Sequence, residues 1–424
     1  MGAGLPSINV YIGTAVDSDN FTLDDATKGK LDTGGTLSAP LGYTLSDITD
    51  SVRDGDGVTI SRGGSRNQGP YFRAEAGTCS FTLDNRDGDF DPLNLSGTWV
   101  SGGVSQLRPG LVVVVTPTLN SVEGDPLFVG TVQSWNVSYP MKGSDSVAKV
   151  VCGDAISELA AADLYAQPVQ GSLENVGARL NRILDNIGWG SQWRIIDDDG
   201  TETLQSTVMA QPAWTEMLLS SDSANGYLFV NRHGWIVYKT KSRFPRVSDA
   251  YFADSGIPVD SLEVSTDAAQ IYNYVKMGRK DGNVQAFRDV TSEALYGTRS
   301  YGRTDLVVST DSQVSESADH ILSQFRDLHR RVESIRVTAA QDTETADWQT
   351  LLSLDLLQRV SSTFSTTDGR TVVMESLVRG ISLTVRPFVW DWTISTSQAP
   401  NVFGDFTLDS VSLGILDTNT LVSF

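Results

Sequence analysis

The stretch from Tyr71 to Leu95 limits the fold more than any other part of the chain. Apolar side chains alternate from Phe72 to Ala76, and they alternate again from Cys79 to Leu83 after a one-residue change of phase. This slip at Gly77-Thr78 predicts a strand with a β-bulge, because glycine adopts backbone angles that other residues avoid. Residues 84–91 are then rich in carboxylate and amide side chains, and Gly88 among them can take a positive φ. The stretch therefore predicts a strand that ends in a tight polar turn.

Further strands are predicted on both sides of this stretch, because apolar residues alternate between turn signals. The segments are Ile8–Ile12, Val58–Gly63, Leu111–Val115 after the Pro109-Gly110 turn, Leu127–Trp135 and Val147–Cys152. Five or six strands broken by turns point to a barrel or a sandwich. Residues 17–50 hold few large apolar groups and are predicted to form a long loop or an extension that reaches a neighbour.

The pattern changes to helices and strands near Ile156. Apolar residues from Glu174 to Gly188 recur at helical spacing, with Gly188 placed to cap the C-terminus. A second short helix is predicted after Pro212, and a hairpin is predicted over residues 227–238. This part therefore predicts a small α/β unit inserted in a mainly β chain.

The remaining sequence again favours strands. A hairpin is predicted over residues 271–287, with its turn at Asp281-Gly282, and a helix is predicted at Glu316–Arg331. Strands are predicted at Ile335–Ala339, Leu356–Phe364, Thr371–Glu375 and Ile381–Val385. A final strand is predicted through Trp390, Trp392 and Ile394. Asp368-Gly369 predicts a tight hairpin. Residues 396–424 carry scattered apolar side chains and are predicted to form an arm that docks on something else.

Composition excludes some functions. The chain has 424 residues, of which 40% are hydrophobic and 20% charged, as in folded proteins. Its formal charge is −20, whereas a protein that grips nucleic acid needs clustered Lys and Arg. An acidic surface instead suits a conduit through which DNA passes without sticking. The first residues lack the basic and apolar pattern of a signal peptide, so none is expected, and the longest aliphatic run, Leu111–Val115, is far too short to span a membrane.

The acidic turn offers the only candidate metal ligands, Asp84, Asp87, Asp89 and Asp91. Carboxylate oxygens suit Ca²⁺, but the spacing is not that of an EF-hand loop, and a plain acidic turn is the favoured interpretation. Asp89 and Asp91, or Asp197–Asp199, could also be paired as a hydrolytic site. Adjacent Asp residues in loops are more often solvated turns. No residue is therefore assigned a catalytic role, and no cofactor is expected.

Other residue types were weighed in the same way. Lys276, Arg279 and Lys280 form the densest basic group, which favours a solvated face over a phosphate site. Cys79 and Cys152 lie in predicted strands, where buried free thiols are favoured over a disulfide. The tryptophans considered for sugar stacking are Trp99, Trp135, Trp189, Trp193, Trp235, Trp390 and Trp392. Tryptophans that alternate with aliphatic residues are more often core or interface.

Several motifs resemble one family. The segments TLDNRDGDFDPLN (82–94), LRPG (107–110), LFVGTVQSW (127–135), GYLFVNRHGWIVYK (226–239) and DVTSEALYGTRSY (289–301) resemble the minor tail proteins of long-tailed, siphovirus-type bacteriophages. These are similar to the tail-tip baseplate hub proteins that close the distal end of the tail tube. The resemblance extends over most of the chain.

The resemblance implies a fold and an assembly. It implies a mainly β chain with two tail-tube-like β-barrel domains, a small α/β domain and extended terminal arms. The expected divisions are an N-terminal arm and first barrel at 1–165, the insert at 166–245, a second barrel with a packed helix at 246–395, and a C-terminal arm at 396–424. It also implies a homotrimer in the virion, assembled in the host cytoplasm, with DNA passing through its lumen. The implied partners are the distal tail protein, the tape measure protein and other tail-tip or fibre proteins.

Two alternatives stay open. The chain could be the distal tail protein, which forms a hexameric ring above the hub, although the α/β insert over residues 171–240 favours the hub. It could also be a tail-associated protein that binds or hydrolyses glycans. That alternative requires paired carboxylates and stacked tryptophans in one pocket.

Overall fold

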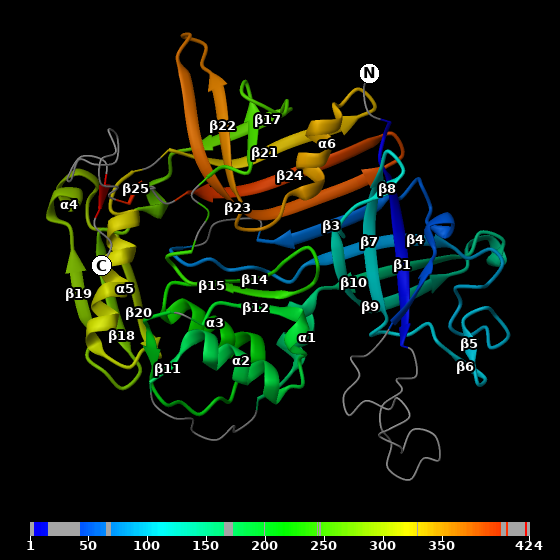
Figure 1. Cartoon of the computed structure of the whole chain (residues 1–424), viewed down its shortest axis with the longest axis horizontal. Helices are drawn as coiled ribbons and strands as arrows, with labels where there is room; N and C mark the ends of the chain where they lie inside the picture. Colours follow the sequence, from blue (N-terminus) through cyan, green and yellow to red (C-terminus); the bar gives the residue numbers. More distant parts are fainter. Residues whose placement is uncertain are drawn as a thin grey trace.

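A computed structural model describes residues 4–15, 43–64, 69–164, 173–198, 200–243, 245, 247–328, 330–399, 404–405 and 420–421. Strands make up most of its regular structure, and helices are few (Figure 1). The predicted fold class, mainly β with an α/β insert, is confirmed. No helix in these ranges is long and apolar enough to cross a membrane.

One 14-stranded sheet dominates the molecule. The N-terminal third supplies a run of antiparallel neighbours in the order β3-β4-β10-β9-β7-β1-β2, with β8 beside β7. These strands are β1 (Ser7–Ala15), β2 (Tyr43–Asp47), β3 (Val58–Gly63), β4 (Thr78–Asp84), β7 (Val112–Leu119), β8 (Val122–Glu123), β9 (Phe128–Ser138) and β10 (Val147–Gly153). The strands predicted at Ile8–Ile12, Val58–Gly63, Leu111–Val115, Leu127–Trp135 and Val147–Cys152 are present, and Leu111, Val113 and Val115 are buried as the pattern requires.

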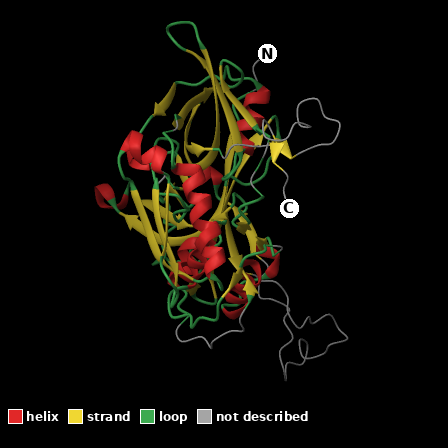
Figure 2. Cartoon of the chain, turned by 90° about the vertical axis from the view of Figure 1, so that its left-hand side faces the viewer, coloured by secondary structure: helices red, strands yellow, loops and turns green. Residues whose placement is uncertain are grey.

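The C-terminal third extends the same sheet. Its strands are β16 (Ala250–Ala253), β17 (Ser261–Ser265), β21 (Arg331–Ala340), β22 (Arg359–Ser365), β23 (Thr371–Arg386) and β24 (Val389–Gln398). β23 pairs with β3, so residues 380–385 lie beside residues 58–63. Glycines permit this approach, since a Cβ on Gly380 would lie 2.3 Å from the carbonyl oxygen of Gly64. The β22–β23 hairpin rises at the top of both Figure 1 and Figure 2.

The insert packs helices against a small sheet of β12 (Arg194–Ile196), β15 (Ile236–Lys239) and β14 (Tyr227–Val230). Its helices are α1 (Ala155–Ala161), α2 (Val176–Asn186) and α3 (Ala213–Ser223), and β11 (Glu174–Asn175) pairs with β13 (Thr203–Leu204). Asn175 caps α2 by accepting a 2.7 Å bond from the amide of Ala178. Both predicted helices and the predicted hairpin are confirmed.

A third unit stands apart from the large sheet. It consists of β18 (Tyr274–Arg279), β19 (Gln285–Arg288), α4 (Val290–Tyr296), β20 (Ser300–Leu306) and α5 (Asp311–Phe325), with α5 on its three-stranded sheet. Residues 246–395, which were expected to form a second barrel, thus contribute strands to two sheets. The number of barrels and the domain boundaries stay predictions.

The remaining elements are short, apart from α6 (Thr345–Ser353), which the sequence analysis missed. They are the strands β5 (Val100–Ser101), β6 (Val104–Ser105), β25 (Gly404–Asp405) and β26 (Thr420–Leu421), and the 3-10 turns η1 (Thr49–Ser51), η2 (Pro140–Gly143), η3 (Ser191–Trp193) and η4 (Ala268–Gln270). α6 buries Trp348 against the rings of Trp390 and Trp392, at centroid distances of 5.6 Å and 5.7 Å.

The predicted bulge at Gly77-Thr78 is wrong. Residues 71–77 are not a strand, and β4 begins at Thr78. Phe72 is buried because its ring packs edge-on against Tyr227 and Phe229 of the insert, each at 5.8 Å, and Ala76 is exposed. The alternation therefore reflects docking between units. A register irregularity lies instead in the pairing of β10 with β9, between Val151 and Cys152.

Other predicted boundaries also need correction. The helix predicted at Glu316–Arg331 is α5, which begins after the Thr310 cap and ends at Phe325, since Arg331 already starts β21. The two strands predicted within residues 371–385 form the single strand β23. The stretch predicted as a loop over residues 17–50 contains β2. Residues 16–42 of that stretch, and most of the predicted C-terminal arm, lie outside the described residues.

Candidate functional site

Asn85 organises the acidic turn that follows β4. It is 1% exposed, and its side-chain oxygen accepts a 2.8 Å bond from the amide of Phe90. Its side-chain nitrogen donates to the hydroxyl of Ser146 at 3.0 Å, and that hydroxyl donates to the Ser138 carbonyl at 3.2 Å. The turn is therefore anchored to the β9–β10 connection by a buried amide.

The aromatic side chain in the turn completes this anchor. Phe90 is 6% exposed and lies between the rings of Trp99 and Trp135, at centroid distances of 6.1 Å and 6.4 Å. The indole nitrogen of Trp135 donates to the carbonyl of Phe90 at 2.9 Å. Trp99 and Trp135, which were candidates for sugar stacking, thus pack on this turn.

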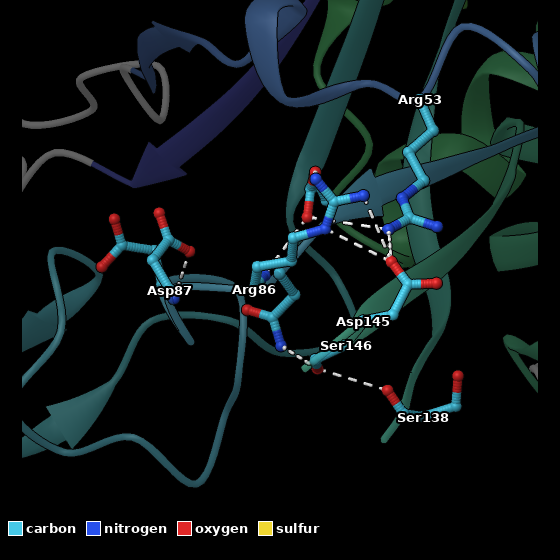
Figure 3. A network of polar contacts seen from close by, with 9 residues as sticks. Arg53, Arg86, Asp87, Ser138, Asp145 and Ser146 are labelled. Carbon is cyan, nitrogen blue, oxygen red and sulfur yellow. Dashed lines mark hydrogen bonds and ion pairs between the residues drawn. The ribbon is translucent and has the colours of Figure 1, made fainter. Parts of the chain in front are cut away.

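Two arginines surround the first carboxylate of the turn (Figure 3). Asp84 lies 3.3 Å from a guanidinium nitrogen of Arg86 and 3.8 Å from one of Arg53. Both arginines also pair with Asp145, Arg86 at 3.2 Å. Their hydrogen bonds hold the pKa of the Asp145 carboxyl below its usual value. Asp84 therefore belongs to a surface ion network.

The other carboxylates act mainly as acceptors for their own loop. Asp87 accepts from the amide of Asp89 at 3.3 Å, and Asp91 accepts from the amide of Leu93 at 2.9 Å. Asp91 also accepts a 2.6 Å bond from the hydroxyl of Tyr139. These are turn contacts of the kind that Asp forms without a metal. Within the described ranges, no group of three or more His, Cys, Asp and Glu side chains is arranged to hold a metal ion.

Asp197 and Asp198, from the second group considered as a hydrolytic site, differ in burial. Asp197 is buried and lies 3.3 Å from the ammonium nitrogen of Lys239, and it also accepts a 3.2 Å bond from the amide of Thr240. Asp198 is exposed, and Asp199 lies outside the described residues. Asp197 therefore ties the end of β12 to the end of β15.

The other tryptophans and basic residues considered as sites contact neighbouring side chains of the fold. Trp390 and Trp392 are buried with Trp348. The guanidinium of Arg279 pairs with Asp311 at 2.6 Å, and the Lys276 ammonium lies 4.9 Å from the ring centre of Tyr274.

The two cysteines face each other across the sheet. Cys79 and Cys152 are buried, free and directly opposite in the pairing of β4 with β10. Burial raises the pKa of the Cys152 thiol to about 12, and it raises that of Cys79 as well. Both are therefore protonated at neutral pH and unreactive as nucleophiles.

Sequence reasoning missed the ion pairs that join the units, each of which includes at least one buried side chain. Asp222 of α3 is 1% exposed and pairs with Arg73 at 3.0 Å and Arg303 at 2.7 Å. Asp355 pairs with Arg62 of β3 and accepts a 3.1 Å bond from the amide of Arg232. These partners lie between 81 and 293 residues apart, so no local pattern could reveal them.

Comparison with known proteins places the fold. No family model matches the chain, and no curated protein matches its sequence. A tail protein from Neisseria meningitidis superposes with a TM-score of 0.54 at 10% identity, covering 94% of this chain and 97% of that one. The 43 kDa tail protein of prophage MuSo2 from Shewanella oneidensis superposes with a TM-score of 0.53 at 11% identity, covering 92% and 98%. The chain therefore has the fold of phage tail proteins along almost its whole length.

Proposed function

We propose that this chain is a structural component of a phage virion tail tip. It acts as a hub that closes the distal end of the tail tube, links the tube to the tail-tip and receptor-binding proteins, and forms part of the DNA-delivery channel. The observation that carries this proposal is the similarity to two tail proteins over more than nine-tenths of the chain. The five tail-hub motifs of the sequence support the position at the tip.

The proposed assembly is a homotrimer. Residues 1–165 and 246–395 would supply tail-tube-like units, and residues 166–245 the insert. Its neighbours would be the distal tail protein, the tape measure protein and other tail-tip or fibre proteins. A formal charge of −20 on each copy supports a lumen that repels DNA phosphates rather than holding them.

An exposed apolar patch supports a contact with such neighbours. Leu93 and Leu95, just after the acidic turn, are 81% and 61% exposed, and Tyr139 and Met141 in the β9–β10 connection are 50% and 79% exposed. The bond from Tyr139 to Asp91 brings the two loops together. Exposed apolar side chains on two adjoining loops are candidates for an interaction site. This tail-tip patch consists of Leu93, Leu95, Tyr139 and Met141.

Negative-stain imaging and the mass of the purified protein in solution test the proposal. A threefold ring with three times the chain mass of 45.8 kDa is expected. The double variant Leu93→Asp/Met141→Asp should weaken its assembly or its binding to the distal tail protein. Val290→Asp is the matched control, because Val290 is 66% exposed on α4 and outside the patch.

Other outcomes would favour the alternatives. A sixfold ring would indicate the distal tail protein. A monomer that cleaves cell-wall glycan, and loses that activity in Asp89→Asn/Asp91→Asn, would indicate the hydrolase. No residue is proposed as catalytic, because Asp91 is bonded within its loop and to Tyr139.

A further inference from the structure

The three-stranded sheet of the third unit has one covered face and one open face. Val275 and Met277 of β18 are buried and α5 packs against β18 and β19, so the helix covers the face that these two residues share. On the other face, five of six side-chain positions are exposed and Tyr274 is half-buried. These six positions, which we call the open face, form two rows of directly opposed residues, Arg288–Tyr274–Ser300 and Ala286–Lys276–Gly302.

The strand pairing favours a cover for the open face. β18 and β20 pair in parallel, with Tyr274 beside Ser300 and Lys276 beside Gly302. All-parallel sheets are nearly always covered on both faces, whereas an antiparallel edge such as β19 tolerates solvent on one side. The parallel half of this sheet therefore has the geometry of a surface that another surface covers.

The open face is cationic. Its charged residues are Lys276 and Arg288, and none of its six residues is acidic. Arg288 pairs with Glu293 of α4. Lys276 has no carboxylate partner among the described side chains, and its ammonium lies 4.9 Å from the ring centre of Tyr274. A surface that covers the open face should therefore carry carboxylates.

The acidic turn supplies carboxylates of this kind. Asp87 and Asp91 accept bonds from amides of their own loop, and Asp89 accepts a 3.4 Å bond from the hydroxyl of Thr98. In the part of the chain that the structure describes, none of the three pairs with a cation. The negative charge of the turn is therefore available to a partner.

The two surfaces lie toward opposite ends of one molecule. Figure 1 shows β18 and β19 at the left end of the longest axis, and β5 and β6, which follow the acidic turn, at the right end. The turn therefore cannot reach the open face of its own chain. A contact between the two surfaces requires a second copy.

We propose that the open face of one copy binds the acidic turn of a second copy of this chain, with Lys276 facing the turn's carboxylates. The contact joins two different surfaces, so it is heterologous and can pass from copy to copy around a closed ring. The inference rests on the proposed function, because it identifies the surfaces through which copies of the proposed hub meet.

Charge reversal in the full-length protein tests the contact. Lys276→Glu places a carboxylate opposite the turn, and Asp89→Lys places an ammonium opposite the open face. Like charges across an interface are costly, so each reversal should raise the concentration needed for assembly about tenfold or more. The combined variant restores opposite charges and should assemble as the unchanged chain does. Sedimentation velocity over a concentration series measures each assembly.

Two features of the design keep the test decisive. Arg336→Glu is the matched control, because Arg336 is exposed on β21 of the large sheet and belongs to neither surface, and it should leave assembly unchanged. Asp89→Lys alters only the turn, so it tests the contact even if Lys276→Glu disturbs the small sheet. Reversals that assemble like the unchanged chain would overturn the proposal, and so would a combined variant that stays as weak as the single ones.

The number of copies separates this inference from the proposed hub. A threefold ring that is insensitive to both reversals would overturn the contact and leave the hub standing. A sixfold ring that both reversals weaken, and that the combined variant restores, would support the contact and overturn the hub. A chain that stays monomeric at every concentration would overturn both.

Discussion

Replacing Asn85 by Ala should destabilise the protein far more than any change to the carboxylates around it. The substitution removes the acceptor of the Phe90 amide and the donor to Ser146. Ser146, the partner of Asn85, is labelled in the network of Figure 3. The substitution therefore tests whether the buried amide of Asn85 or the charged side chains stabilise the turn.

The expected loss of stability depends on which hydrogen bonds Phe90 and Ser146 keep in the variant. The amide of Phe90 would lose its acceptor in a site that is 6% exposed, which costs about 1–3 kcal/mol. The Ser146 hydroxyl keeps its bond to the Ser138 carbonyl, so its loss is one neutral hydrogen bond of about 0.5–1.5 kcal/mol. Together these losses should lower the free energy of unfolding by about 1.5–4.5 kcal/mol.

Urea unfolding measures this loss, followed by tryptophan fluorescence and far-UV circular dichroism together. Coincident transitions would justify the two-state treatment. Asp87→Ala is the matched control, because Asp87 accepts only a bond within the exposed part of the turn, and its cost should stay within about 0.5 kcal/mol. Equal costs for the two variants, or a cost below about 0.5 kcal/mol for Asn85→Ala, would refute the reasoning.

Three further predictions concern other parts of the chain. Adding Ca²⁺ or a chelator should leave the urea midpoint unchanged, since the carboxylates of residues 84–91 are used by their own turn; a midpoint raised by Ca²⁺ would indicate an ion site. Burial raises the pKa of Asp154 to about 7, so the folded state binds its proton more tightly than an unfolded Asp near pKa ~3.9. The free energy of unfolding should therefore fall as the pH rises between these values, and Asp154→Asn should flatten that fall in urea titrations at pH 5.5 and 7.5. Trp348→Ala should cost about 3–5 kcal/mol by the same assay, whereas Trp348→Phe should cost much less, because the buried indole nitrogen has no hydrogen-bond partner in the described part of the chain.

Alternation predicted strands well where one face of a strand is buried in its own sheet. Leu111–Val115 and Val147–Cys152 both became strands for this reason. Alternation failed at Phe72–Ala76, where the side chains pack on the insert and no ladder forms. It also failed to place α6, whose buried Trp348 rests on two tryptophans of β24 more than 40 residues later. Packing between distant segments is invisible to a local pattern.

The acidic turn shows the same limit of local sequence patterns. The polar turn was predicted from its Asp, Asn and Gly content, but its buried member, Asn85, was not distinguished from the half-buried and exposed carboxylates beside it. One signal was available, because Asn85 directly follows the last residue of β4, where a side chain can bond back to the sheet. The partner of Arg62, 293 residues away, carried no such signal.

The pairing of β3 with β23 also determines when the fold can be completed. During synthesis β3 can pair with β4 at once, but its other edge must wait until residues 380–385 have left the ribosome. Pairing across such a separation is slow, and an unpaired edge recruits other strands. A chain interrupted before residue 380 would therefore carry an open edge and aggregate. This topology makes translation through the β23 strand a condition for closing the β3 edge of the large sheet.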